Sequence, residues 1–189
     1  PWWFNALAQE KTQHPLVDGW LFNAPPEAWL EADLANSHYV LLLGTNPALS
    51  NRGRNASQNL KALHDAPDRK LAVVDPRRSE TAARADLHIA LRPGSDAFLL
   101  LGMAALIVQR GRIDRAFVKR HVNNVEPLLS QLAAIDVHDM AARCQVPVAQ
   151  LETLAEGFAS APSACIYMDL GLEQGLFSTL TSYLMLSLI

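Results

Sequence analysis

The chain has 189 residues, of which 50% are hydrophobic and 19% are charged, and its formal net charge is −3. That composition is typical of a globular domain with a sizeable core and excludes a disordered chain. Because 16 basic residues nearly balance 19 acidic ones, no overall positive field would attract nucleic acid. We therefore expect a globular domain without a nucleic-acid partner.

The apolar residues and the cysteines exclude further classes of protein. The longest nearly apolar stretches, residues 97–108 and 180–189, have about a dozen residues or fewer, short of the roughly 20 that a membrane span needs. Cys144 and Cys165 form no C-x-x-C motif, so neither a disulfide framework nor a cysteine-ligated cluster is predicted. The six histidines show no metal-ligand spacing. We expect core helices, no membrane span and no metal-binding residue.

The first part of the chain differs in character from the rest. Residues 1–26 are rich in tryptophan and proline and predict an irregular lead-in segment, followed by one domain over residues 27–189. The chain starts at Pro1 rather than Met and stops within an apolar helical pattern at residues 183–186. We therefore expect a domain truncated at both ends, and the sequence does not distinguish a cytoplasmic from a periplasmic location.

Strands and helices alternate from residue 27 onwards. Short apolar runs predict strands at residues 38–43, 70–74, 87–91 and 164–168. Helices are predicted at residues 27–34, in the stretch to 64, around 80–84, over 97–108, in three segments of 114–160 split near Asn123-Asn124 and Val146-Pro147, and from 176. This alternation predicts a three-layer α/β fold of Rossmann-like type, with a mostly parallel sheet and helices on both faces.

Polar residues follow directly where the predicted strands end. Asp75 comes after the strand at residues 70–74, where a carboxylate commonly accepts hydrogen bonds from ribose hydroxyls, although it could equally cap a helix. Arg77 and Arg78 can donate paired hydrogen bonds to phosphate, and their position at a strand end favours that role over a solvated surface pair. This segment therefore predicts a small anionic ligand.

Gly44, Thr45 and Asn46 follow the first predicted strand. Gly44 lets a backbone approach a ligand closely, and the two polar residues offer short side chains at the start of a helix. A simple turn is an equal alternative, because such sequences are common in turns. The loop is not G-x-G-x-x-G, so the fingerprint of NAD-binding domains is absent.

Two further loops follow strand ends. In the loop after residues 87–91, Gly94 allows close packing of a base, and Asp96 could accept the paired N–H donors of a guanine. Asp96 could also cap the following helix, and one side chain can do both. Residues 169–175 follow the last strand. Because parallel strands share a carboxyl edge, we expect all these loops to line one crevice.

Taken in order, these loops resemble the signatures of the molybdopterin oxidoreductases, the dimethyl sulfoxide reductase family that includes formate dehydrogenases and nitrate reductases. The resemblance covers residues 35–189. It rests on Gly44-Thr45-Asn46-Pro47 and on the segments Val74 to Ala82, Ala85 to Ile89, Leu91 to Asp96 and Gly171 to Gln174.

The resemblance implies a Rossmann-like domain that binds molybdopterin guanine dinucleotide within a molybdenum or tungsten oxidoreductase. The parent would catalyse two-electron redox or oxygen-atom transfer, while this fragment alone would be inactive, and its catalytic residues are not assigned. Carried onto this sequence, the diphosphate meets Gly44, Thr45 and Asn46, the ribose and phosphate meet Asp75, Arg77 and Arg78, the guanine meets Gly94, Ser95 and Asp96, and the pterin side meets Gly171 and Gln174.

The sequence departs from the family pattern where the ligand of the metal is expected. No cysteine lies upstream of Gly44, where the family's metal ligand is expected. An iron–sulfur cluster, where the family has one, belongs to an N-terminal domain that this chain lacks. The resemblance therefore implies the remaining domains of the parent chain, and an electron-transfer subunit, as partners.

Two alternatives remain. The first is a cofactor-free structural homologue within a larger electron-transfer complex, like the large subunit of respiratory complex I. The second is an NAD-binding module, which the missing glycine-rich fingerprint disfavours. The presence together of Asp75, Arg77, Ser95 and Asp96 favours cofactor binding, because carboxylates that face an empty crevice contribute nothing to stability.

Overall fold

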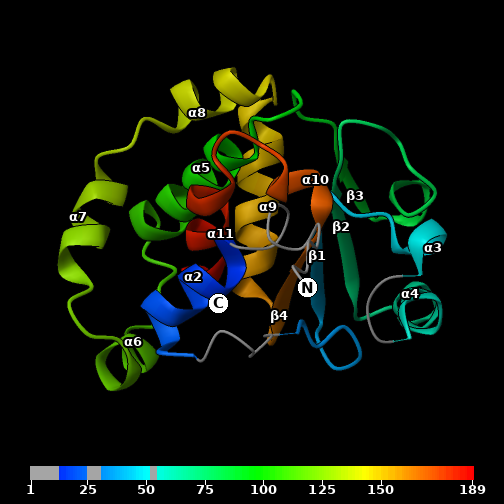
Figure 1. Cartoon of the computed structure of the whole chain (residues 1–189), viewed down its shortest axis with the longest axis horizontal. Coiled ribbons are helices and arrows are strands. Elements are labelled where there is room, and N and C mark those ends of the chain that lie inside the picture. The colour runs from blue at the N-terminus through cyan, green and yellow to red at the C-terminus, as the bar shows by residue number, and fades with distance from the viewer. Residues whose placement is uncertain (1–12, 25–30, 52–54) are drawn as a thin grey trace, which may run out of the picture.

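The computed structural model describes residues 13–24, 31–51 and 55–189. Within these ranges helices surround a small sheet (Figure 1). The elements in chain order are α2 (Gln13–Phe22), β1 (Tyr39–Leu43), α3 (Pro47–Ser50), α4 (Ala56–Asp65), β2 (Lys70–Val74), the 3-10 helix η1 (Ala82–Arg84), β3 (Leu87–Ile89), α5 (Asp96–Gln109), α6 (Arg115–His121), α7 (Glu126–Ala133), α8 (Val137–Cys144), α9 (Val148–Ser160), β4 (Ala164–Met168), α10 (Leu170–Glu173) and α11 (Ser178–Leu186).

The sheet has four strands in the order β3-β2-β1-β4, and every neighbouring pair is parallel. Leu43 at the end of β1 is in register with Val74 of β2 and Met168 of β4. All residues of β1 are buried, as expected for a strand covered on both faces. The predicted α/β fold with a parallel sheet is confirmed.

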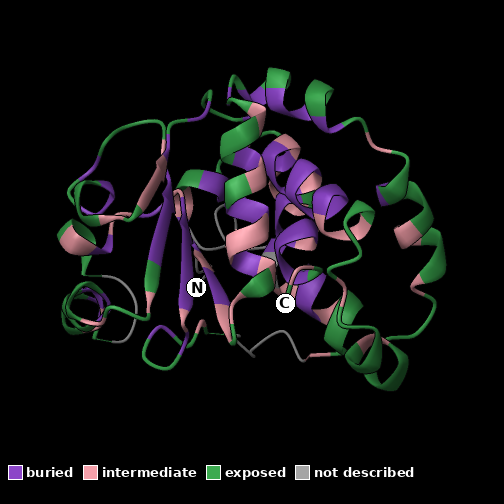
Figure 2. Cartoon of the chain, turned by 180° about the vertical axis from the view of Figure 1, so that it is seen from behind, coloured by how far each residue is buried: buried purple, intermediate pink, exposed green. Residues whose placement is uncertain are grey.

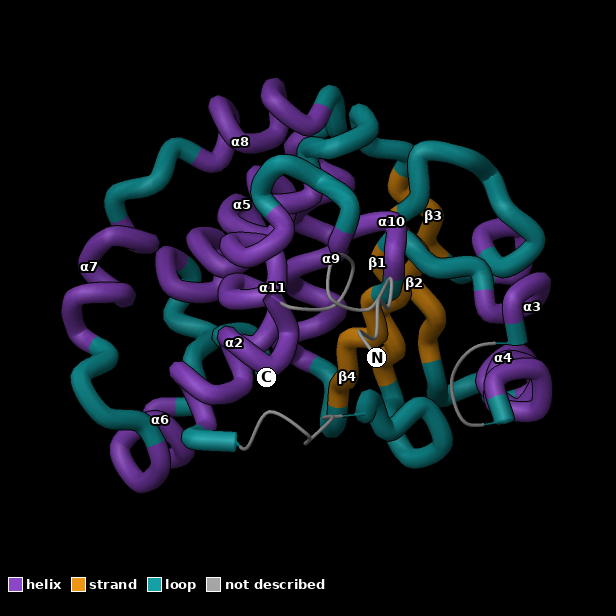
Figure 3. Tube along the Cα trace, in the orientation of Figure 1, coloured by secondary structure: helices purple, strands orange, loops and turns teal. Residues whose placement is uncertain are grey.

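Helices cover both faces of the sheet, which lies between α9 and α4 in Figure 3. Alternate residues of β1 point to opposite faces. Leu41 and Leu43 belong to a core that α5, α8, α9 and α11 complete, whereas Val40 and Leu42 pack with Leu60 and other residues on the α4 side. Figure 2 shows the strands and the inner helices buried and the outer helical faces exposed. No helix among the described residues is long and apolar enough to span a membrane.

Several predicted boundaries match the structure. The strands at residues 70–74 and 164–168 are as predicted, because their apolar runs end at charged or turn-forming residues. The region 114–160 contains four helices rather than three. The additional break precedes α8, where the Asp136 carboxylate accepts hydrogen bonds from the backbone N–H groups of His138 and Asp139 and so starts a new helix.

Two predictions in the N-terminal part need correction. Gln13–Phe22 forms a helix, where the sequence predicted an irregular segment, because Val17 is fully buried and the helix packs against α11. The predicted helix at residues 27–34 lies partly outside the described residues, and residues 31–33 are not helical. The domain boundary at residue 27 stays a prediction.

Tyr39 offers a test of the buried sheet. Burial, and secondarily the charge of Asp86, raises the pKa of Tyr39 to about 12, because its ring lies under α9 and packs edge-on to Phe158. A raised acid pKa means that the folded state holds the proton more tightly than the unfolded state. The contribution of Tyr39 is therefore fully present below about pH 10, the unfolded-state pKa, and is lost as pH rises through about 12.

We predict that Tyr39→Phe removes this part of the alkaline loss of stability, about 2–3 kcal/mol in total. Urea unfolding of wild type and variant at a neutral and an alkaline pH measures the difference. The wild-type free energy of unfolding should fall more steeply with pH than that of the variant. Equal pH slopes would contradict the prediction.

Candidate functional site

The carboxyl ends of all four strands meet at one edge of the sheet. The order β3-β2-β1-β4 also places a switch point between β1 and β4, because the chain proceeds outward from β1 on one side and returns on the other. Ligands of open α/β sheets bind in the crevice at such a point. We call the loops that follow the strands at this edge, residues 44–46, 75–81, 90–96 and 169–174, the carboxyl-edge site; the prediction that they share one edge is confirmed.

Gly44 and Gly171 contact each other directly at the switch point. The Gly171 N–H donates to the Gly44 carbonyl oxygen at 3.0 Å, and the Gly44 N–H donates to the Val74 carbonyl oxygen at 3.1 Å. Gly44 has a φ of +56°, a left-handed conformation that favours glycine. A Cβ atom on Gly171 would lie 2.5 Å from the Gly44 carbonyl oxygen. The floor of the site is therefore backbone, with no room for a side chain.

Thr45 lies next to this contact and carries an unsatisfied hydroxyl. The residue is 5% exposed, and its Oγ1 has no hydrogen-bond partner among the described residues. A buried hydroxyl without a partner destabilises the fold, by about 1–3 kcal/mol in mutational data. Thr45 thus has unused hydrogen-bonding capacity at the place where a ligand is expected.

The side chain of Asn46 is directed to the neighbouring loop. Its Oδ1 accepts from the Thr81 hydroxyl at 2.7 Å and from the Thr81 N–H at 3.2 Å. Its Nδ2 donates to Glu80 at 2.7 Å. The predicted contact of Asn46 with a diphosphate stays a prediction, and these bonds are interactions that the sequence reasoning missed.

Asp75 shapes the loop after β2. Its Oδ1 accepts from the Arg77 N–H at 2.8 Å, an Asx turn that fixes the start of the loop. The Arg77 guanidinium forms an ion pair with Glu80 at 3.3 Å, and both Arg77 and Arg78 are exposed. The pKa of the Glu80 carboxyl is lowered by its own backbone N–H and by the Asn46 amide. Both guanidinium groups can therefore be reached by a ligand, although Arg77 is already paired.

Asp96 is the half-buried carboxylate of the site. Burial is the main cause that raises its pKa, the backbone N–H of Asp96 itself lowers it, and the charge of Asp75 adds a smaller rise. Two carboxylates from adjacent strand ends therefore repel each other here. Asp96 is the first residue of α5 rather than its N-cap, because Ser95 occupies the cap position. The predicted N-cap position is thus wrong, and the carboxylate instead accepts a hydrogen bond from its own backbone N–H in the first turn of α5.

Ser95 and Gly94 have different environments. Ser95 is fully buried, and its hydroxyl donates to the Arg92 carbonyl oxygen at 2.6 Å, so its side chain holds the loop together. Gly94 is exposed with a φ of +76°, and a Cβ atom there would meet nothing within 4 Å. The surface above Gly94 is therefore open to a flat group, whereas a contact between Ser95 and guanine stays a prediction.

The loop after β4 contributes Gln174 and two buried acids. Gln174 is exposed, and its N–H donates to the Leu170 carbonyl oxygen at 3.3 Å, which leaves the predicted pterin contact untested. Asp169 accepts from the Leu170 N–H at 2.9 Å and starts α10. Glu173 is 3% exposed, and its carbonyl oxygen accepts from the Gln13 side chain at 3.5 Å. The burial of Glu173 could not be predicted from the sequence, because it involves a contact with α2, a helix that was not predicted.

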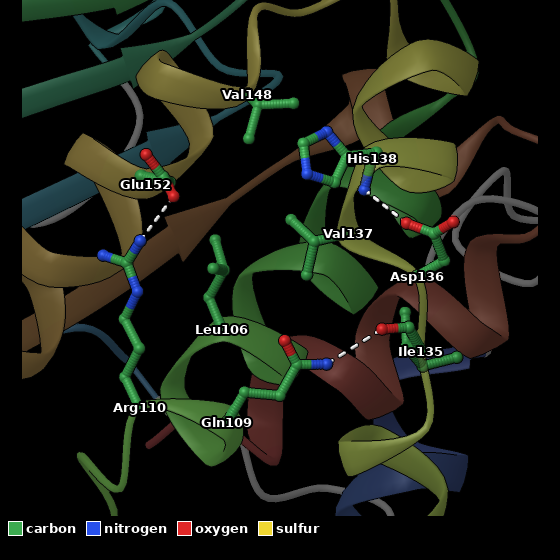
Figure 4. Close-up of a pocket in the computed structure, with 9 residues that line it drawn as sticks. All are labelled: Leu106, Gln109, Arg110, Ile135, Asp136, Val137, His138, Val148 and Glu152. Atoms are coloured by element: carbon green, nitrogen blue, oxygen red, sulfur yellow. Dashed lines mark hydrogen bonds and ion pairs between the residues drawn. The ribbon is translucent and has the colours of Figure 1, made fainter.

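A separate cavity of about 330 Å³ lies between α5, α8 and α9 (Figure 4). Its walls include Leu106, Val137 and Val148, and an ion pair between Arg110 and Glu152 lies at its rim. None of its lining residues belongs to the carboxyl-edge site.

Comparison with known proteins agrees with this geometry. The family model of the molybdopterin oxidoreductases matches residues 3–167. The chain belongs to the molybdopterin oxidoreductase family. The matched region contains the strands and the loops after β1, β2 and β3, and it ends just before Met168, the last residue of β4.

Individual members of the family are similar over most of this chain. A nitrate reductase of Synechocystis sp. is 33% identical over 152 residues, which cover 78% of this chain and 20% of that protein. Formate dehydrogenase H of Escherichia coli is 30% identical over 147 residues, 75% of this chain and 19% of that protein. The chain thus spans about a fifth of the length of these curated relatives.

A solved structure has the same fold. The chain superposes on acetylene hydratase from Pelobacter acetylenicus with a TM-score of 0.80, covering 98% of this chain and 25% of that one at 23% identity. At this identity the similarity is one of fold, and it includes the parallel sheet that positions the loops.

The contact between Gly44 and Gly171 predicts a strong effect of one methyl group. Gly171→Ala should destabilise the chain by about 1–3 kcal/mol or more, because the new Cβ would meet backbone atoms that cannot turn aside. Urea unfolding measures the change. Gly175→Ala is the matched control, since its Cβ would lie 3.4 Å from the Leu172 carbonyl oxygen, an ordinary contact. Similar stabilities of the two variants would contradict the prediction.

Proposed function

We propose that this chain is the part of a molybdenum or tungsten oxidoreductase that binds molybdopterin guanine dinucleotide. The observation that carries the proposal is the half-buried Asp96 carboxylate, held at the carboxyl edge beside Asp75 while Ser95 occupies the N-cap position of α5. A carboxylate in that position gains stability from the paired N–H donors of a guanine.

The residues present fit the group at several points. The Thr45 hydroxyl supplies an unused hydrogen-bonding group, and Gly44 brings the backbone to the surface of the switch point. Arg77 and Arg78 are exposed cations for the diphosphate, and the open surface at Gly94 accepts a base. When bound, such a cofactor supplies the metal at which two electrons, and in some reactions an oxygen atom, are exchanged. The role of this chain is to hold the nucleotide end.

The parent protein is proposed from the relatives. Because the chain spans about a fifth of the nitrate reductase and the formate dehydrogenase, we propose that it is a fragment and that further domains complete the site. An iron–sulfur cluster in an N-terminal domain and an electron-transfer subunit belong to the same proposal. Catalysis of two-electron redox or oxygen-atom transfer would need those parts, so the fragment alone is inactive.

One observation favours the alternative of a cofactor-free structural homologue. The Arg77 guanidinium is already paired with Glu80, and a paired cation has less to offer a phosphate. The pair is exposed, however, with 64% and 52% of the two side chains accessible, so it contributes little and a diphosphate can displace Glu80. Cofactor binding therefore remains the better-supported function.

The nucleotide end of the cofactor tests the proposal directly. We predict that GDP shifts the backbone amide resonances of the loops that contain Asp75 and Asp96 in two-dimensional NMR spectra of the chain. Asp96→Ala should raise the Kd for GDP at least about tenfold, because each donor left unpaired costs on the order of 1–3 kcal/mol. ADP, which lacks the paired donors of guanine, should bind more weakly and respond less to the substitution.

Asp136→Ala provides the matched control. Asp136 caps α8 with two hydrogen bonds, so its loss should lower stability by about 1 kcal/mol and leave GDP binding unchanged. If GDP shifts no resonance of the wild-type chain at millimolar concentration, the cofactor-free alternative is the better description. If Asp96→Ala lowers only the stability, Asp96 has no part in guanine recognition.

A further inference from the structure

Thr81 lies at the centre of a hydrogen-bonded connection between two loops. Its side chain is fully buried, and its hydroxyl donates to Asn46 Oδ1 at 2.7 Å and accepts from the Ala48 N–H at 3.1 Å. The Thr81 N–H donates to the same Asn46 oxygen at 3.2 Å. A hydroxyl that both donates and accepts in this way is held in one orientation. The loops after β1 and β2, which are distant in the sequence, are thereby joined away from the strands.

The connection extends to the residues proposed to meet the diphosphate. Asn46 Nδ2 donates to Glu80 at 2.7 Å, and Glu80 pairs with the Arg77 guanidinium at 3.3 Å. On the other side, Asn46 is the immediate neighbour of Thr45, whose buried hydroxyl has no partner among the described residues. A continuous series of bonds thus leads from Asn46, the neighbour of Thr45, through Glu80 to the Arg77 guanidinium.

We propose that Thr81 and Asn46 form a positioning clamp that sets the distance between Thr45 and Arg77 and thereby the affinity for a diphosphate. The proposal rests on the function proposed above. It assigns Asn46 a different role from the direct ligand that the sequence predicted, because both ends of its amide are used within the protein. Thr81 does not touch the ligand and acts only through Asn46.

The buried part of the clamp can fix a distance, whereas its exposed part cannot. Exposed ion pairs are weak and mobile, and the Arg77–Glu80 pair is of that kind. The bonds between Thr81 and Asn46 are shielded by the full burial of Thr81, and loss of one partner leaves the other unsatisfied. Removal of the Thr81 hydroxyl should therefore loosen the first loop relative to the second, while the guanine end near Asp96 is untouched.

The test compares two ligands, GDP and guanosine, which differ in the diphosphate. Thr81→Val removes the hydroxyl at nearly constant shape, and it should weaken GDP binding about tenfold, equivalent to 1.4 kcal/mol, with little change for guanosine. Thr81→Ser keeps the hydroxyl and should restore GDP binding to within about threefold of wild type, a difference below 1 kcal/mol. NMR titration measures both affinities below the melting temperature of each variant.

A double-mutant cycle separates positioning from direct contact. If Thr81 acts through Asn46, adding Thr81→Val to Asn46→Ala should weaken GDP binding no further, because Asn46→Ala already removes both bonds between the two residues. Additive losses would mean that Asn46 contacts the diphosphate itself, and the clamp would be overturned. Asn46→Ala also serves if Thr81→Val fails to fold, since it alone must show the same difference between GDP and guanosine.

Thr181→Val is the matched control. Thr181 is 2% exposed, and its hydroxyl donates to the Phe177 carbonyl oxygen at 2.9 Å at the start of α11, so both affinities should be unchanged. GDP binding that Thr81→Val leaves unchanged would overturn the clamp alone. Equal weakening of GDP and guanosine would also overturn it, because a general loosening of the fold would be the cause. Absence of GDP binding by the wild-type chain would overturn the clamp together with the proposed function.

Discussion

The close approach of Gly44 and Gly171 determines the form of the site. Backbone meets backbone at the point where β1 and β4 diverge, and the hydrogen bond between them holds the two loops together without any side chain. A residue with a Cβ atom at either position would separate the two loops. The relative positions of Thr45 and the other polar groups of the carboxyl-edge site therefore depend on this contact.

The fold separates stability from binding along each strand. The strands are mostly apolar, and β1 is buried along its whole length, so they contribute to the core, while the candidate ligand-binding groups lie in the few residues after each strand. Because all strands are parallel, these groups gather at one edge of the sheet. The residues of the loops can then change while the core stays intact. This is consistent with one fold occurring in relatives named as a nitrate reductase and a formate dehydrogenase.

The sequence predicted the features that local patterns determine. The strands at residues 70–74 and 164–168 are continuous apolar runs with polar ends, and the shared edge follows from parallel pairing. The helix at Gln13–Phe22 was missed, because it is stabilised by packing against α11 rather than by its own periodicity. The directions of Asn46 and Ser95 were also inaccessible, since each side chain can bond either a ligand or a nearby loop, and only the three-dimensional distance decides. Glu80 and Thr81, which follow the two arginines, were the available signal in the sequence. Their presence alone does not identify Asn46 as their partner.

The burial of Asp96, together with a smaller effect of the Asp75 charge, would couple the proposed guanine binding to protons. The pKa of Asp96 is raised in the free protein, whereas N–H donors from a guanine would favour its charged form and lower that pKa. Binding would then displace a proton wherever Asp96 is partly protonated, so affinity should decline as the pH falls through the raised pKa. On the proposed function, a lower pH would therefore favour release of the guanine end of the cofactor.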